Sequence, residues 1–309
     1  DMVVMISRLG YIKRVSVEKY KKQDRGGKGS NSAALLEDDY INQLFIGSTK
    51  DYLLFITNVG KAYWIKVHEI PESERTSRGA HIKSLLAVGP DEEITAVVSL
   101  KEFAEDQYLF MTTANGVVKK VHTTEFSNAK TRGIIGLKLD TGDKLISAIQ
   151  TTGSTEVMLI SRRGKALKIK EDSVRSMGRA SRGIKGMKLA EGDEIAAAVK
   201  VEEGTGLILV TEKGHGKRIS SDLFSTHGRG TGGQRIFGNI DGKGEIIGAV
   251  SICDSDEIVC MTSQGKTLRI KATEIKQQGA GASGITIVKV SEPDYLVGID
   301  KVQEKRDNE

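Results

Sequence analysis

The chain has little proline, cysteine and aromatic side chain: of its 309 residues, 3 are proline, 2 are cysteine and 5% are aromatic. So little proline excludes collagen-like and proline-rich chains. Cys253 and Cys260 stand seven residues apart, which fits neither a disulfide framework nor the paired Cys-x2-Cys of a structural zinc site. No run approaches the roughly 18 apolar residues of a membrane span. These absences predict a soluble globular protein of a reducing compartment, without a membrane partner.

Glycine, by contrast, is abundant, and its placement reveals an internal repeat. Four mostly apolar residues, a Ser or Thr, two free positions and a Gly recur six times, at intervals of 50, 56, 48, 50 and 51 residues. A second glycine follows 16 to 19 residues after the first in every copy. The first position holds Gly10, Gly60, Gly116, Gly164, Gly214 and Gly265, and the second holds Gly26, Gly79, Gly133, Gly183, Gly232 and Gly284.

Each repeat predicts four antiparallel strands. Its apolar runs are short, rich in Val and Ile, and separated by glycine and charged turns, and no helical period persists over a dozen residues. The first glycine stands where a hairpin requires a positive φ, which glycine adopts without steric penalty. One four-stranded sheet cannot cover both of its faces. Six of them are therefore expected to pack radially, in an all-β, propeller-like fold.

The repeats are expected to form one domain over residues 1–302. Its units span about 1–51, 52–107, 108–155, 156–205, 206–256 and 257–302, and a charged tail follows over 303–309. Residue 1 leads into an apolar run at Val3 with no basic leader before it. This start indicates a fragment of a longer protein.

Acidic and basic residues are segregated within each repeat, in a chain of net charge +5 and pI near 9.0. Acids gather in the turn before the fourth strand, and bases gather around the first hairpin and beside the second glycine. Four positions after the first glycine, five of the six repeats place Lys or Arg, and the second repeat places Trp64. In a radial stack such a base predicts a basic band, which suits the phosphate backbone of duplex DNA without base readout. The scarcity of aromatic residues disfavours stacking of single-stranded bases.

Motifs for catalysis or cofactor binding are not found. The five histidines form no His-Glu-x-x-His pattern and have no cysteine near them in sequence. Two Gly-x-Gly-x-x-Gly strings begin at Gly228 and Gly279, but both lie between predicted strands, with no helix N-terminus to bind a pyrophosphate. We predict no catalytic residue, no metal site and no cofactor in this chain.

Residues 23–29 read Gln-Asp-Arg-Gly-Gly-Lys-Gly. This segment resembles the gyrase A box, Gln-Arg-Arg-Gly-Gly-Lys-Gly, of the C-terminal domain of the DNA gyrase A subunit. The six repeats resemble the same domain over residues 1 to about 302. Asp24 departs from the family pattern, which usually has a base there. A carboxylate should be repelled by phosphate unless it pairs with Arg25 or Lys22, so the departure puts a phosphate contact at position 24 in doubt. Carried over by position, the box is Gln23, Asp24, Arg25, Gly26, Gly27, Lys28 and Gly29.

The resemblance implies a six-bladed β-pinwheel in which neighbouring blades exchange strands, with duplex DNA wrapped right-handedly around its outer rim. The chain is then a non-catalytic domain of an ATP-hydrolysing type II topoisomerase, and its wrap supports negative supercoiling. The implied partners, in the bacterial cytoplasm near the nucleoid, are the rest of the gyrase A subunit, and through it the B subunit. The residues expected on the DNA-binding rim are Arg14, Lys22, Arg78, Lys119, Lys120, Arg132, Arg162, Arg163, Lys165, Lys168, Arg179, Arg182, Lys217, Arg218, Arg229 and Arg269.

Two other functions are compatible with this architecture. The equivalent domain of topoisomerase IV would target DNA crossings without strong wrapping, but the near-complete box and six full repeats favour gyrase. A protein-binding propeller scaffold would need an apolar or aromatic patch, which the sequence does not show. A propeller enzyme is disfavoured further, because its carboxylates or metal ligands should converge from inner strands, whereas these acids recur in turns.

Overall fold

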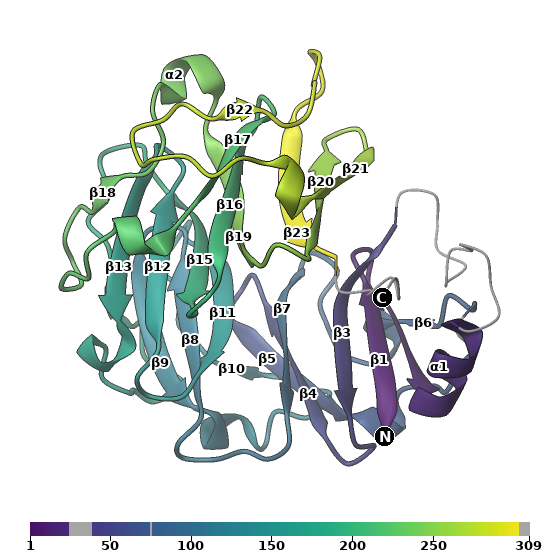
Figure 1. Ribbon diagram of the computed structural model, residues 1–309. Coiled ribbons are helices and arrows are strands. Elements are labelled where there is room, and N and C mark those ends of the chain that lie inside the picture. The colour runs from purple at the N-terminus through teal and green to yellow at the C-terminus, as the bar shows by residue number, and fades with distance from the viewer. Residues whose placement is uncertain (25–38, 75, 303–309) are drawn as a thin grey trace.

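The computed structural model describes residues 1–24, 39–74 and 76–302. It contains six small antiparallel sheets, the blades, arranged around an axis (Figure 1). The prediction of an all-β, six-bladed propeller is confirmed. Each blade is numbered by the repeat that supplies its first hairpin.

The first five blades share one strand order. From the axis outwards lie the repeat's fourth strand, its first, its second, and a two-residue strand supplied by the next repeat. Blade 1 holds β3 (Ile41–Gly47), β1 (Met2–Ser7), β2 (Tyr11–Ser16) and β6 (Ala80–His81); blade 2 holds β7 (Ile94–Leu100), β4 (Tyr52–Thr57), β5 (Lys61–Lys66) and β10 (Ile134–Ile135); blade 3 holds β11 (Leu145–Thr151), β8 (Tyr108–Thr113), β9 (Val117–His122) and β14 (Ile184–Lys185).

The last three blades continue the pattern, and blade 6 has three strands among the described residues. Blade 4 holds β15 (Ile195–Val201), β12 (Glu156–Ser161), β13 (Lys165–Lys170) and β18 (Gln234–Arg235); blade 5 holds β19 (Ile246–Ile252), β16 (Gly206–Thr211), β17 (His215–Ile219) and β22 (Ile285–Thr286); blade 6 holds β23 (Leu296–Lys301), β20 (Glu257–Thr262) and β21 (Thr267–Lys271). Exchange of the outermost strand thus joins each of the first five blades to its successor.

A short 3-10 helix follows the second strand in repeats 2 to 6, and one more follows the exchanged strand β6. They are η1 (Val67–Glu69), η2 (Ile82–Ser84), η3 (Thr123–Phe126), η4 (Glu171–Ser173), η5 (Ser221–Leu223) and η6 (Ala272–Glu274). One short α-helix, α2 (Ile240–Lys243), precedes β19.

A second α-helix, α1 (Val17–Asp24), follows β2 and is not predicted by the sequence analysis. Its apolar residues Val17 and Tyr20 pack on the buried face that Val3 and Val15 form in blade 1. A helix of this length is marginal in water by itself. The helix is stabilised by its contact with blade 1, and its sequence therefore does not show a sustained helical period.

Both glycine positions have the backbone geometry that the repeat requires. All six glycines of the first position have a positive φ, for example +82° at Gly60. A Cβ at Gly60 would lie 2.7 Å from the carbonyl oxygen of Leu137. At the second position, Gly79, Gly133, Gly183 and Gly284 also have a positive φ, and in the fifth repeat the glycine with positive φ is Gly233, at +74°, one residue after Gly232.

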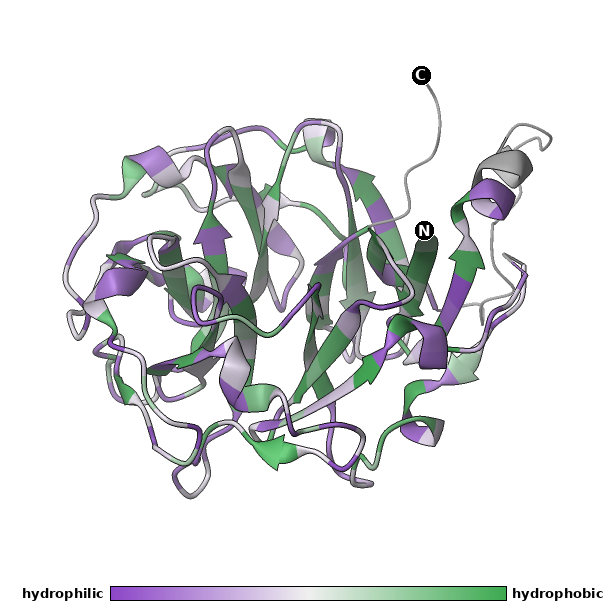
Figure 2. Cartoon of the chain, turned by 90° about the horizontal axis from the view of Figure 1, so that it is seen from below, coloured by the Kyte–Doolittle hydropathy of each residue, from purple (hydrophilic) through white to green (hydrophobic). Residues whose placement is uncertain are grey.

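The apolar core lies between neighbouring blades. Because side chains alternate along a strand, Leu53 and Phe55 of β4 face blade 1 while Leu54 and Ile56 face blade 3. The strands β8, β12 and β16 repeat this arrangement, so that five clusters join each of the first five blades to the next. In Figure 2 the hydrophobic stretches lie mainly in the strands around the axis, and the loops outside them are of mixed hydropathy.

The contact between the first and last blades is built differently. Tyr40, Val259, Met261 and Val302 form a small buried cluster there. The hydroxyl of Tyr40 donates to Oδ2 of Asp300 at 2.6 Å and lies 3.0 Å from Sδ of Met261. Burial raises the pKa of Tyr40, and the nearby carboxylate of Asp300 raises it further. Tyr40 therefore carries the contact through which blade 1 meets blade 6.

Candidate functional site

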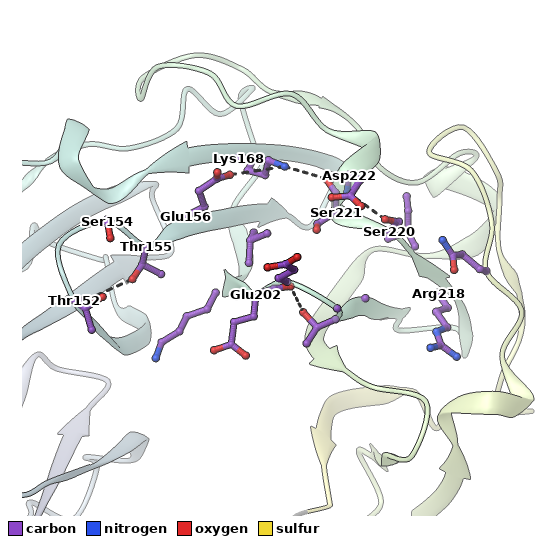
Figure 3. Close-up of a pocket in the computed structure, with 18 of the residues that line it drawn as sticks. Thr152, Ser154, Thr155, Glu156, Lys168, Glu202, Arg218, Ser220, Ser221 and Asp222 are labelled. Carbon is purple, nitrogen blue, oxygen red and sulfur yellow. Dashed lines mark hydrogen bonds and ion pairs between the residues drawn. The ribbon is translucent and has the colours of Figure 1, made fainter.

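The base that recurs four positions after the first glycine reaches from one blade to the next. Its side-chain nitrogen donates to a backbone carbonyl in or beside the 3-10 helix that follows the second strand of the next repeat, and Figure 3 shows Lys168 of β13 reaching Ser221 in this way. Trp64 fills the same position because an N–H donor is required there and a charge is not. The pairs are Arg14 with Ile70, Trp64 with Phe126, Lys120 with Glu171, Lys168 with Ser221 and Arg218 with Ala272, at 2.6 to 3.4 Å.

These connecting bases do not form the exposed band that the sequence predicts. Lys120 is buried, with its ammonium group 4.7 Å from the centre of the Tyr108 ring. Arg14, Lys168 and Arg218 are half-buried, and each lies beside a carboxylate. The assignment of these four residues to a DNA-binding rim is corrected, because their donors are already used between blades.

Two other predicted rim lysines, Lys119 and Lys217, are fully buried. The ammonium group of each donates to three backbone carbonyls at 2.5 to 3.1 Å. Burial lowers the pKa of each lysine to about 8, since the charged form is poorly solvated inside a protein. Neither side chain can reach a phosphate, and both are removed from the rim.

Several predicted rim residues are accessible but already have partners. Arg163 donates to Asp241 at 2.7 Å, and Arg182 lies 3.1 Å from the carboxylate of Asp140. Such exposed ion pairs contribute little to stability and can exchange for phosphate. The remaining ones are Arg78 stacked on Tyr11, Arg162 with Glu245, Arg179 with the carbonyl of Ile135, and Arg229 with the carbonyls of Ser173 and Lys185.

Three predicted rim residues, Arg132, Lys165 and Arg269, are exposed, and their side chains have no hydrogen bond or ion pair within the described residues. Lys165 has a feature of its own. It stands directly opposite Arg235 in the register of β13 and the exchanged strand β18. Like charges in opposed positions are destabilising. Lys165 and Arg235 lie at the outer edge of the blade without an anionic partner in the described part of the chain, so a phosphate bound between them would be stabilised by both charges.

Arg235 was not among the predicted rim residues, and neither were Lys185 and Lys188 of the same surface. All three are exposed. Lys188 shares with Lys165 a shallow groove of about 310 Å³ that Gly232, Gly233 and the acidic Asp193 also line. Their repeat position could have identified Arg235 and Lys185 in the sequence. Each follows the glycine with positive φ, Gly233 or Gly183, by two residues. We call Lys165, Lys188 and Arg235 the blade 4 edge; Lys185 lies on β14, the exchanged strand of blade 3.

The predicted box lies mostly beyond the described residues. Lys22, Gln23 and Asp24 are the last three residues of α1. Arg25, Gly26, Gly27, Lys28 and Gly29 fall outside the described ranges, so the box remains a prediction.

The acids before the fourth strand support the first hairpin. Oδ1 of Asp143 accepts the N–H of Asn115, and Asp193 and Asp294 accept the equivalent N–H groups of their own repeats, at 3.0 to 3.2 Å. In the first repeat Asp39 does the same for Leu9. The recurrence of these acids thus has a local structural cause.

The cavity drawn in Figure 3 offers no site of a single chemistry. It measures about 830 Å³, opens widely and is lined by bases such as Lys200 and by acids such as Glu202 and Asp222 (Figure 3). Across residues 1–24, 39–74 and 76–302, no three His, Cys, Asp or Glu side chains gather as a metal site would require. In those same ranges no helix has the length and apolar character needed to span a bilayer.

Comparison with known proteins gives consistent matches over the whole chain. The family model described as DNA gyrase C-terminal domain, beta-propeller, matches residues 1–48, 51–101, 107–152, 155–202, 207–253 and 256–303. The DNA gyrase A subunit of Treponema pallidum (strain Nichols) is 61% identical over 98% of this chain and 37% of its own length. The corresponding gyrase subunit of Escherichia coli (strain K12) is 38% identical over 100% of this chain and 35% of its own length. The chain thus spans little more than a third of the curated relatives it matches.

Two solved structures share the fold. The C-terminal domain of DNA topoisomerase IV has a TM-score of 0.85 and 26% identity, over 97% of this chain and 92% of that one. The DNA gyrase A C-terminal domain has a TM-score of 0.73 and 33% identity, over 97% of this chain and 99% of that one.

Proposed function

Because the chain belongs to the family of DNA gyrase C-terminal β-propeller domains, we propose that it binds duplex DNA along the outer edges of its blades and bends it. The bend would be a right-handed wrap that supports ATP-dependent negative supercoiling by the parent topoisomerase. The domain itself contributes no catalytic group to that reaction. Its partners would be the remainder of the gyrase A subunit, and through it the B subunit, in the bacterial cytoplasm.

The observation that supports DNA binding most directly is the blade 4 edge. Three cations lie there, with Lys165 and Arg235 opposite each other on β13 and β18 and Lys188 in the groove beside Lys165. The side chains of Lys165 and Arg235 have no carboxylate partner among the described residues. Backbone phosphates are bound by such charges without base readout. Arg132, near the exchanged strand of blade 2, and Arg269, in blade 6, extend the same chemistry to other outer edges.

Binding of this kind should depend steeply on salt. With about six phosphate contacts, affinity for a duplex should fall roughly 10³-fold between 50 and 200 mM salt, because each contact releases condensed counterions. Titration of the chain with a labelled 40-bp duplex over that range measures the slope. An affinity independent of salt would contradict the proposal.

The box is proposed as a second DNA contact. Two glycines between Arg25 and Lys28 would let backbone N–H groups approach a phosphate that both cations flank. Replacing Arg25 and Lys28 together by Ala should reduce or abolish the linking-number change of a circle that is relaxed while bound. Unfolding of the variant at the wild-type temperature would show that the fold is intact. Unchanged topology would refute the box assignment.

The alternative is the topoisomerase IV type of domain, which the TM-score of 0.85 favours on shape. The linking-number assay separates the two functions. A circle closed by a nicking-closing enzyme should gain a change in linking number if DNA wraps around the domain. Salt-dependent binding without a change in linking number would favour the topoisomerase IV type of function. If the chain binds neither the circle nor the duplex, the protein-binding scaffold would be the favoured function.

A further inference from the structure

Lys119 of β9 lies beneath a loop at the outer edge of blade 3. Its side chain is fully buried, and Nζ donates to the carbonyls of Gly136, Arg179 and Ser181 at 2.9, 2.5 and 2.9 Å. Two of these acceptors belong to residues 178–182, the loop that leads into the exchanged strand β14. One ammonium group therefore fixes the backbone of this loop from below.

Packing alone does not require a lysine at this position. The equivalent residue in blade 4 is Leu167, which is also buried, at 1% exposure. Burying an ammonium group is costly unless its hydrogen bonds are satisfied, so an apolar side chain would be the simpler choice. What Lys119 adds is three donors directed mainly at one loop.

The loop above Lys119 carries two guanidinium groups. Arg182 exposes 63% of its side chain and lies 3.1 Å from Asp140 at the surface. Arg179 donates to the carbonyl of Ile135 at 2.9 Å, and the N–H of Lys138 donates to the carbonyl of Ser181 at 3.1 Å. The loop is thus fixed across two blades while Arg182 remains available to solvent.

Lys217 provides a matched case in blade 5. It is equally buried, and its ammonium group donates to the carbonyls of Gly279, Ala280 and Ala282 at 2.8 to 3.1 Å. The loop above it, residues 279–282, reads Gly-Ala-Gly-Ala and bears no charge. These two lysines therefore have the same structural task, but of the two, Lys119 alone supports a loop that carries cations. Lys13, at the equivalent position of blade 1, is also buried and donates at 2.7 Å to the carbonyl of Ser77, next to Arg78.

We propose that Lys119 is a positioning residue for DNA: it holds the 178–182 loop so that Arg182 meets the phosphate backbone at the edge of blade 3. This inference rests on the proposed function. Because the loop is already ordered, less conformational entropy is lost when Arg182 binds a phosphate, and the affinity for DNA is higher.

The test compares Lys119→Met and Lys217→Met in the 309-residue chain, using thermal unfolding and titration of a 40-bp duplex at several salt concentrations. Both variants should unfold at lower temperature than the wild type. Lys119→Met should also bind DNA about tenfold more weakly, with a salt slope lower by about 1, the value for one lost phosphate contact. Lys217→Met should bind as the wild type does.

A double-mutant cycle with Arg182→Ala tests whether Lys119 acts through that arginine. Adding Arg182→Ala to Lys119→Met should weaken binding little further, because the contact is already lost. Equal binding losses in both methionine variants, or an unchanged slope in Lys119→Met, would overturn the inference. If the methionine variants do not fold, Lys119→Gln and Lys217→Gln provide the same comparison with an amide donor retained. If the wild-type chain shows no salt-dependent DNA binding, the proposed function is refuted as well. If the wild type binds and Lys119→Met binds equally tightly, only the positioning role of Lys119 is refuted.

Discussion

Replacing Lys165 and Arg235 together by Ala is expected to weaken duplex binding about a hundredfold and to reduce the salt slope by about 1.8, the value for two phosphate contacts. The two cations stand opposite each other on β13 and β18, and neither side chain has an anionic partner in the described part of the chain. A phosphate would thus be their counter-charge. Fluorescence anisotropy with a labelled duplex measures both quantities.

Stability should respond in the opposite direction. Opposed like charges on neighbouring strands cost up to about 1 kcal/mol, so their removal should leave the free energy of unfolding unchanged or slightly raised. Lys168→Met is the matched control, because Lys168 lies in the same strand but donates between blades to Ser221. It should lower stability and leave the salt slope intact. A double alanine variant that binds with the wild-type slope would exclude the blade 4 edge as a DNA contact.

Truncating Tyr40 to Ala should lower the free energy of unfolding by about 3–5 kcal/mol, the usual cost of removing a buried aromatic side chain. Tyr40 is 2% exposed, and its cluster with Val259, Met261 and Val302 joins the first and last blades. The loss should therefore open this contact as well as weaken the fold. Chemical denaturation measures the first effect, and small-angle scattering measures the increase in radius of gyration.

Tyr40→Phe separates the hydroxyl from the ring. It keeps the apolar packing but removes the donor to the half-buried carboxylate of Asp300, whose pKa is raised by desolvation. An unsatisfied buried group typically costs about 1–3 kcal/mol. Tyr295→Ala is the control, since that tyrosine of blade 6 is 51% exposed and should matter little. Wild-type dimensions and stability in Tyr40→Ala would contradict the assignment of Tyr40 as the closing contact.

Much of the fold can be read from the sequence because its causes are local. A positive φ at Gly60, like the Ser or Thr three positions before each first glycine, belongs to one hairpin. Oγ of Ser161, for example, accepts the N–H of Lys165 four residues on, at 3.1 Å. Such short-range requirements recur in every repeat, so counting them gives six blades. The helix α1 is not predicted in this way, because its stability depends on packing against blade 1 and not on a local sequence requirement.

The candidate site was predicted less well, and the reason is the direction of side chains. Lys119 and Lys120 are neighbours on one strand, so they face opposite sides, yet both are buried: the first beneath a loop and the second between blades. A basic residue at a fixed repeat position therefore does not by itself indicate a basic surface. Nor does the sequence show that Arg235, 70 residues after Lys165, returns to lie opposite it.

The six repeats, the hairpins and the family follow from the amino-acid sequence, because these depend on glycine, on alternation and on a short motif that are all set within tens of residues. Which cations are free depends on how the blades pack against one another. Because of strand exchange, the outer edge of each of the first five blades contains strands from two repeats. The packing of neighbouring blades also buries several of the predicted rim residues. The meeting of Tyr40 with Asp300 is of the same kind, since it joins the two ends of the ring.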